Sequence, residues 1–283
     1  MIRLAIQKSG RLSEGTLELL RDCGISVQNG TSSLKCMASN FPMEVLFLRD
    51  DDIPQYVSDG VADIGILGQN VVVEKAKNIR EVLPLGFSKC RLSLAISKGD
   101  EYTGLEWFNG KNIATSYPKL LSDYLQKHGI TAAIHEISGS VEIAPGIGLA
   151  EGICDIVSSG STLFSNGLKE VEVVFRSEAV LVSGGDLSAE KQQLLDKLIF
   201  RINAVKASRN NKYVLLNAPN DRLQDIIKVL PGMKSPTILP LAEEGWSSVH
   251  SVMSEDRFWE VIDALKEAGA QGILIVPIEK MVV

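Results

Sequence analysis

A run of small hydroxyl residues between an aliphatic segment and the start of a helix is the strongest chemical signal in this sequence. The segment reads Asp155-Ile156-Val157-Ser158-Ser159-Gly160-Ser161-Thr162-Leu163. Backbone N–H groups at a helix start and neighbouring hydroxyls can cradle a phosphate, and a glycine lets the backbone approach the anion. Asp155 could accept hydrogen bonds from ribose hydroxyls or help to hold Mg²⁺. A serine and glycine turn that only caps a helix is the alternative.

Positively charged residues gather where other predicted strands end. The cations are Lys8, Arg11, Arg49 and Arg91, and Gly10 lies between the first two. Two cations around a glycine, as at the end of the first strand, suit a chain of phosphates, and Arg91 beside Cys90 could add charge to the same cleft. Surface turns often have the same composition, however, and a buried arginine could instead pair with an acid such as Asp63.

Two acidic segments contain potential metal ligands. Asp50, Asp51 and Asp52 are consecutive, and because successive helical residues point about 100° apart they cannot share one ion from a helix. We expect them to cap a helix over residues 53–59 instead. Glu142 precedes a turn at Pro145, so it is either a second ribose or Mg²⁺ contact or a solvated side chain.

The composition excludes several classes of protein. Lys and Arg total 29 against 35 Asp and Glu, which gives a net charge of −6. This balance disfavours nucleic acid or an anionic membrane as the main partner, while a local cluster of cations could still bind a small polyanion. The four cysteines and three histidines have neither disulfide-framework nor metal-ligand spacing. With neither a signal peptide nor a membrane span evident, we expect a cytoplasmic protein.

Short apolar runs alternate with helical periodicity through the first two thirds of the chain, which predicts parallel sheets covered by helices. The expected strands are residues 3–7, 45–49, 64–67, 92–97, 113–115 and 156–158. The expected helices are residues 13–23, 53–59 and 119–128.

An internal match suggests that this part of the chain is made of two similar lobes. Residues 59–68 and 151–160 share an acid, Gly, an aliphatic residue, a small residue, Asp and Ile in the same order, and each ends in Gly. At nearly the same offset, residues 4–8 resemble residues 94–98. Two α/β lobes would bind a ligand in the cleft between them, at the carboxyl ends of the strands. Chance similarity in Gly- and Ile-rich sequence is the alternative.

The last third of the chain has a different pattern. Residues 189–209 read as one long helix. The segments that follow are expected to be a strand (212–217), a helix (221–230), two strands (237–241 and 247–253), a helix (257–268) and a strand (272–277). This βαββαβ order predicts a ferredoxin-like domain, which could bind a small effector or pair edge to edge with a second copy.

Together these segments resemble the ATP phosphoribosyltransferase family in its long form. The matching residues are QKSGRL (7–12), RDDDIP (49–54), DGVADIGILGQNV (59–71), CRLSLA (90–95), IATSYP (113–118), GSVEIAP (139–145), ICDIVSSGSTLFSNGL (153–168), SPTILPL (235–241) and VPIEKM (276–281). The resemblance implies a two-lobed, periplasmic-binding-protein-like catalytic core and a ferredoxin-like regulatory domain. The implied limits are 1–90 for the first lobe with a return segment at 179–208, 91–178 for the second lobe, and 209–283 for the regulatory domain.

The resemblance also implies a reaction and a set of site residues. The family is a pentosyltransferase of histidine biosynthesis, in which N1 of ATP attacks C1′ of 5-phosphoribosyl 1-diphosphate in the presence of Mg²⁺. Donor binding would fall to Asp155, Ser158, Ser159, Gly160, Ser161 and Thr162, and ATP binding to Lys8, Gly10, Arg11, Arg49, Asp63, Cys90 and Arg91. Asp155, Lys8 and Arg11 would have the catalytic roles, and Asp155 and Glu142 are the candidate Mg²⁺ ligands.

For regulation, the resemblance implies feedback inhibition by histidine, bound near Asn217, Ala218, Thr237 and Ser251. It further implies a homo-oligomer that is active as a dimer and inhibited as a hexamer. Two other functions fit a two-lobed architecture. An aromatic-acid dehydratase with an amino-acid-sensing domain would leave the phosphate-type loop unexplained, and the solute receptor of a transporter would need a secretion signal.

Overall fold

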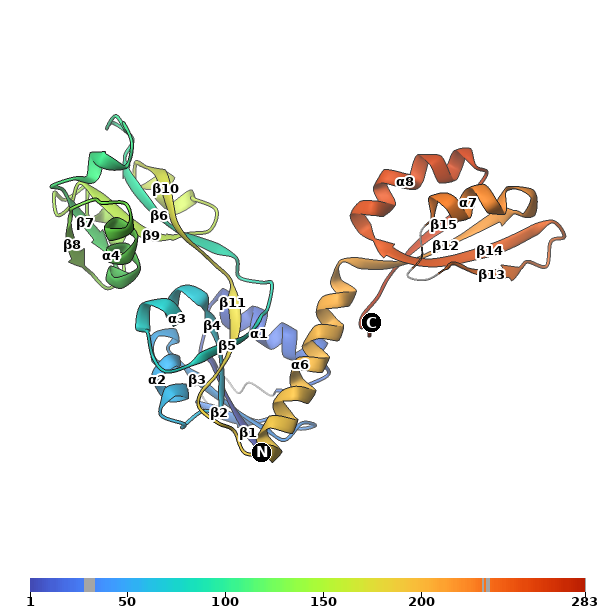
Figure 1. The fold of residues 1–283 in the computed structure, drawn as a ribbon, viewed down its shortest axis with the longest axis horizontal. Helices are drawn as coiled ribbons and strands as arrows, with labels where there is room; N and C mark the ends of the chain where they lie inside the picture. The colour runs from blue at the N-terminus through green and yellow to red at the C-terminus, as the bar shows by residue number, and fades with distance from the viewer. Residues whose placement is uncertain (28–33, 231, 233–234, 283) are drawn as a thin grey trace. The chain divides into compact units, whose positions relative to one another are not determined.

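The computed structural model describes residues 1–27, 34–230, 232 and 235–282 (Figure 1). The chain divides into two compact units, Met1–Asp196 and Lys197–Val283. The division falls inside the long helix α6 (Ala189–Arg209), so this helix belongs to the second unit from Lys197 onwards. No helix in the described part of the chain is long and apolar enough to cross a bilayer.

The first unit contains two sheets. The first sheet has the order β2-β3-β1-β4-β11-β5, and its strands are β1 (Ile2–Gln7), β2 (Lys35–Met37), β3 (Met43–Leu48), β4 (Ile64–Gly68), β5 (Arg80–Pro84) and β11 (Ala179–Ser183). The helices α1 (Arg11–Asp22), α2 (Ile53–Ser58) and α3 (Gln69–Lys75) pack against it. The aliphatic side chains of β1, β4 and β11 are almost wholly buried, as expected for strands covered on both faces.

The second sheet has the order β10-β6-β9-β7-β8. Its strands are β6 (Cys90–Ser97), β7 (Asn112–Thr115), β8 (Ala133–Glu136), β9 (Gly152–Val157) and β10 (Leu168–Ser177). The helix α4 (Pro118–Lys127) covers one face, where Phe108 is fully buried among Leu, Ile and Cys side chains. The short helix α5 (Ser161–Ser165) follows β9.

The chain crosses from the first sheet to the second between β5 and β6, and it returns where β10 runs into β11 (Figure 1). As a result, β11 lies antiparallel to β4, and β6 lies antiparallel to both β9 and β10. The expectation of purely parallel sheets is therefore wrong. A chain that leaves a sheet and comes back enters it in the opposite direction, and the sequence pattern showed neither β10 nor β11.

The strand registers place the carboxyl ends of β4 and β9 beside these crossings. Gly68, the last residue of β4, pairs with Ala179 just after the return crossing. Val157, the last residue of β9, pairs with Arg91 just after the outward crossing. Because β1 and β3 are parallel to β4, and β7 is parallel to β9, the loops that follow these strands all face the same region.

The internal sequence match does not extend to structural equivalence. It aligns β1 with β6, yet β1 is parallel to β4 whereas β6 is antiparallel to β9. It also aligns Asp63, which precedes its strand, with Asp155, which lies within β9. The two lobes are both α/β, but the matched segments occupy different positions in them.

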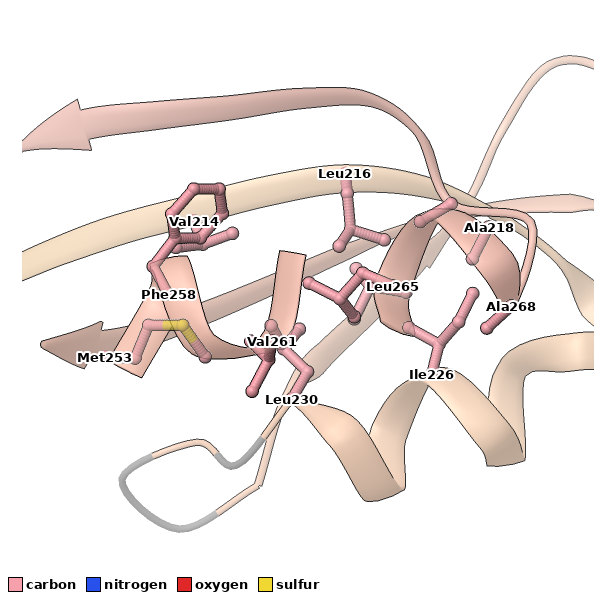
Figure 2. Close-up of a cluster of buried hydrophobic side chains, with 12 residues drawn as sticks. Val214, Leu216, Ala218, Ile226, Leu230, Met253, Phe258, Val261, Leu265 and Ala268 are labelled. Carbon is pink, nitrogen blue, oxygen red and sulfur yellow. The ribbon is translucent and has the colours of Figure 1, made fainter. Parts of the chain in front are cut away.

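The second unit has the predicted βαββαβ order. Its elements are β12 (Asn211–Pro219), α7 (Leu223–Val229), β13 (Thr237–Pro240), β14 (Trp246–Ser254), α8 (Glu255–Glu267) and β15 (Gln271–Pro277). They form an antiparallel sheet of order β13-β14-β12-β15, which is the ferredoxin-like topology. Figure 2 shows the core, in which Val214 and Leu216 of β12 meet Phe258 and Leu265 of α8.

Candidate functional site

A cavity of about 360 Å³ lies where both lobes of the first unit contribute their strand ends. Its lining residues are Gln7, Arg11, Leu12, Asp50, Gly68, Asn70, Val71, Ser88, Lys89, Cys90, Tyr117, Ile156, Ser158 and Ser177. They come from the carboxyl ends of strands in both sheets and from the two crossings. A cavity between the lobes of a two-lobed α/β protein is a usual place for a small ligand.

The hydroxyl-rich loop lies at the edge of this cavity. Gly160 has φ 81°, a left-handed conformation that a side chain would strain, and it turns the chain into α5. The Oγ atoms of Ser159 and Ser161 are 3.0 Å apart, and the Ser161 N–H donates to Ser159 Oγ at 3.4 Å. The hydroxyl residues of the loop, including Thr162, are exposed. This compact, accessible turn can present hydroxyls and N–H groups to one phosphate.

Arg11 connects the two lobes across the cavity. Gly10, at φ 93°, turns the chain from β1 into α1, which begins at Arg11. The Arg11 guanidinium Nη1 donates to Ser158 Oγ at 3.3 Å, so a cation from the first lobe reaches the hydroxyl-rich loop of the second. Lys8 and Arg49 are exposed where β1 and β3 end, in the same region but outside the cavity lining.

Arg91 has a different environment from the one expected. Its guanidinium forms two hydrogen bonds of 2.5 Å with the Glu170 carboxylate, and Nη1 donates to the Ser158 carbonyl at 3.2 Å. Ser93 Oγ donates to the same carboxylate at 2.7 Å. Arg91 lowers the pKa of Glu170, as a paired cation should. Arg91 thus supports the hydroxyl-rich loop from behind and is absent from the cavity lining.

Two carboxylates near the loop influence each other. Asp155 is half-buried, and burial raises the pKa of its carboxyl, with the charge of Glu142 acting in the same direction. The Ile156 N–H, at 2.8 Å from Asp155 Oδ1, opposes that shift. Among the described residues, there is no group of three or more His, Cys, Asp or Glu that could hold a metal by itself.

Asp63 lies away from the cavity. It precedes β4, at the end of the strand opposite to the cavity. Lys191 Nζ is 2.7 Å from its Oδ1, and the Arg3 N–H donates to Oδ2 at 2.8 Å. The side chain is nearly buried by these partners. The expectation of a nucleotide contact is not supported, because a paired acid at the wrong end of the strand cannot reach the cavity.

The three consecutive aspartates form a 3-10 turn before α2. Asp52 is the N-cap residue, but its side chain makes no capping hydrogen bond in the described structure, so the capping prediction is wrong. Asp50 instead lines the cavity, where burial and the charge of Asp51 raise its pKa. Lys75 lies 3.5 Å from Asp51, so this acid is paired with α3.

Several cavity residues were not found by sequence reasoning. Lys89 precedes Cys90 and brings a second cation to the lining. Asn70 and Ser177 form a buried pair in which the serine hydroxyl donates to Asn70 Oδ1 at 2.8 Å. Cys90 also lines the cavity, where burial raises the pKa of its thiol. Asn70 lies in the matching segment 59–71 and Lys89 beside Cys90 and Arg91, so both carried a sequence signal, whereas Ser177 carried none.

The structure separates the four residues proposed to sense an effector in the second unit. Asn217 pairs with Ser248, and Thr237 pairs with His250, on the face of the sheet opposite to the helices. Ala218 and Ser251 lie on the helix-covered face and are buried. The four therefore do not meet in one place within the unit.

A two-lobed α/β core with a hydroxyl-rich loop on one lobe and an arginine from the other defines a class of protein suited to binding a small anion between its lobes. The comparisons specify the family. The model of "HisG: ATP phosphoribosyltransferase" matches residues 49–204, and that of "HisG, C-terminal domain" matches residues 208–280. The chain belongs to the ATP phosphoribosyltransferase family.

Individual relatives agree with this assignment. An ATP phosphoribosyltransferase of Cytophaga hutchinsonii is 64% identical over 100% of this chain and 99% of its own length. One from Bacteroides thetaiotaomicron is 60% identical over 100% of both chains. Among solved structures, the ATP phosphoribosyl transferase (HisG:HisZ) complex of Thermotoga maritima matches with a TM-score of 0.61 and 29% identity, over 72% of this chain and 96% of its own. A protein bound to L-arginine, Tv2483, shares the fold at 13% identity and a TM-score of 0.52, over 73% of this chain and 85% of its own.

The raised pKa of Asp155 predicts a pH-dependent gain in stability for Asp155→Asn. With its folded pKa above the unfolded one, the native state holds the proton more tightly, so stability falls as pH rises through this interval. At pH 7 the asparagine variant should be more stable than the wild type, and the difference should vanish as pH drops below about 3.9. Urea unfolding between about pH 3 and pH 8 measures this, with exposed Asp186→Asn as the control. A variant less stable than the wild type at pH 7 would contradict the role of burial.

Proposed function

We propose that this chain transfers the phosphoribosyl group of 5-phosphoribosyl 1-diphosphate to N1 of ATP, in the cavity of the first unit. The bond between C1′ and the diphosphate oxygen breaks, and a bond between N1 and C1′ forms, giving N1-(5-phosphoribosyl)-ATP and diphosphate. The observation that carries this proposal is the bridge from Arg11 to Ser158, which brings a cation to a loop built for a phosphate. The family membership supplies the identity of the two substrates.

The site residues suit a reaction that separates charge. Displacement of diphosphate builds positive charge on the ribose ring and negative charge on the leaving group. Residues 158–162 would hold the 5-phosphate, and Asp155 would contact the ribose. Arg11 and Lys8 would stabilise the diphosphate as negative charge develops, because fixed cations do so without reorganisation. Adenine N1 has an unprotonated lone pair, so the reaction demands no strong general base.

The carboxylates of Asp155 and Glu142 fit the Mg²⁺ that this chemistry implies. Asp155 and Glu142 are close enough for their charges to interact, and the pKa of Asp155 is raised partly for this reason. A cation between them would relieve that repulsion, and Mg²⁺ commonly binds through one or two carboxylates plus substrate phosphates. When bound, the ion would neutralise the diphosphate. We propose Asp155 and Glu142 as its protein ligands.

Product formation tests the central proposal directly. The purified full-length chain, with ATP, the phosphoribosyl donor and Mg²⁺, should form phosphoribosyl-ATP. Its formation is measured by the change in absorbance of the adenine ring. Diphosphate should appear in equal amount. If neither product forms, the proposed reaction is wrong.

Replacement of Thr162 by valine tests the loop assignment. The change keeps the side-chain shape and removes one hydroxyl near the donor phosphate. A hydrogen bond to a charged group contributes about 1.5–3 kcal/mol, so the KM for the donor should rise roughly tenfold or more. Thermal stability should change little, because Thr162 is exposed. Ser165→Ala, in the last turn of the same short helix, is the matched control. An unchanged donor KM would refute the assignment.

For regulation, we propose that the second unit binds histidine and that the chain works as a cytoplasmic homo-oligomer, active as a dimer and inhibited as a hexamer. The open face of its sheet suits a small polar ligand. His250 Nδ1 is 2.7 Å from the Tyr213 hydroxyl, and Nε2 is 2.9 Å from Ser248 Oγ. Asn217 and Thr237 lie on this face beside that group. These two candidates therefore have better support than the buried Ala218 and Ser251.

Removal of residues 209–283 should abolish inhibition by histidine while catalysis persists. The rate is measured with and without histidine for the full-length and the truncated enzymes. Thr237→Val in the full chain is a second variant, whose histidine concentration for half-inhibition should rise about tenfold if one hydrogen bond to a charged ligand is lost. Full histidine inhibition of the truncated enzyme would show that the regulatory site is elsewhere.

A further inference from the structure

A glutamate of one lobe forms two hydrogen bonds with the start of a helix in the other. Glu74 lies on α3, which packs against the first sheet, whereas α4 belongs to the second. Its Oε1 accepts from the Lys119 N–H at 2.9 Å, and its Oε2 accepts from the Leu120 N–H at 2.9 Å. Both oxygens of one carboxylate thus bind backbone groups of the opposite lobe.

Helix α4 lacks a cap of its own. Its N-cap residue is Tyr117, which makes no side-chain capping bond in the part of the chain that the structure describes, and Pro118 has no N–H. The Tyr117 N–H donates to Thr115 Oγ1 at 2.9 Å, and the Leu121 N–H donates to the Tyr117 carbonyl at 3.1 Å. The amides of residues 119 and 120 are the two that need an acceptor. Glu74 supplies it from across the lobes.

The position of Glu74 on its own helix makes local stabilisation a poor explanation. It lies in the last turn of α3, which ends at Lys75 and is followed by Ala76 at φ 46°. A negative charge near a helix C-terminus is unfavourable, whereas the same charge at an N-terminus is favourable. The carboxylate is therefore better accommodated when the start of α4 is near it than when the lobes are apart.

Both partners of this contact adjoin the cavity. Asn70 and Val71 of α3 line it from the first lobe, and Tyr117, directly before α4, lines it from the second. Asp50 and Asp155 help to raise the pKa of the Tyr117 hydroxyl, although its burial is the larger cause, so Tyr117 lies within electrostatic reach of both acids. A change in the distance between α3 and α4 would move these walls relative to each other.

We propose that Glu74 is a positioning residue, which holds the lobes in their closed arrangement by capping α4 and so sets the position of Tyr117 in the cavity wall. It does not touch the reacting atoms. The expected changes in KM rest on the proposed function, but the contact by which Glu74 holds the two lobes together does not.

We call the contact between the Glu74 carboxylate and the amides of residues 119 and 120 the latch. Hydrogen exchange of the ligand-free, full-length enzyme tests it without any substrate. Glu74→Gln keeps the size of the side chain but leaves an amide nitrogen facing one of the two N–H groups. Exchange in the first turn of α4 should become roughly fivefold faster or more, because charge-assisted hydrogen bonds are lost. A control variant should leave it unchanged: Glu18→Gln, at an exposed glutamate on α1.

Steady-state kinetics then separates a latch from a purely local cap. If Glu74→Gln lowers the closed fraction, both substrates should bind more weakly and their KM values should rise about threefold or more, with kcat within about twofold of wild type. Glu74→Ala should have the larger effect on both readouts. Unchanged exchange in α4 overturns the latch. Faster exchange with unchanged KM values overturns the coupling to the cavity. Absence of any turnover in the wild type would instead contradict the proposed function, and the exchange result would stand.

Discussion

The double crossing of the chain between two sheets is the constraint on which the first unit depends. Because β10 runs directly into β11, the residues at the return crossing have fixed partners in both sheets: Ser177 pairs with Cys90 and Ala179 with Gly68. That register forces the strands of both lobes to end at the crossings, where each following loop can contribute to one cavity. Residues as distant in sequence as Arg11 and Ser158 meet for this reason.

The electrostatics of the cavity follow from which cations are already paired. Arg91, which seemed available from the sequence, is neutralised by Glu170 and fixes the carbonyl at the base of the hydroxyl-rich loop. Charge available to an anion must come from Arg11 and Lys89 in the lining and from Lys8 and Arg49 nearby. A chain with a net charge of −6 can therefore bind polyphosphates in this one cavity. The condition is that the Mg²⁺ carried by the polyphosphates offsets the negative charge of Asp50, Asp155 and Glu142.

The sequence predicted those features that depend on neighbouring residues. The hydroxyl-rich loop was found because its strand, glycine and helix start are contiguous, and the ferredoxin-like unit because its order of elements is regular. The strand β10 was missed because Glu170 and Glu172 hide its apolar alternation; each is satisfied by a partner far away in sequence, Arg91 and Tyr102 respectively. Asp63 was named as an ATP contact through the family resemblance, and the sequence alone cannot show that Lys191, 128 residues away, binds it instead.

Helix α4 shows how a missing local signal can itself be informative. Pro118 suits the first helical position, but Tyr117 at the N-cap offers no side-chain acceptor to the first free amides. In an isolated segment this would leave the helix end to water. In a protein with two lobes, the deficit makes the helix dependent on an acceptor from elsewhere, and Glu74 provides it only when the lobes are together. Thr115 accepts from the Tyr117 N–H, which lies before the helix, so it does not satisfy the two amides that Glu74 caps. A helix whose first free amides are capped from the opposite lobe is suited to coupling closure to the shape of the cavity.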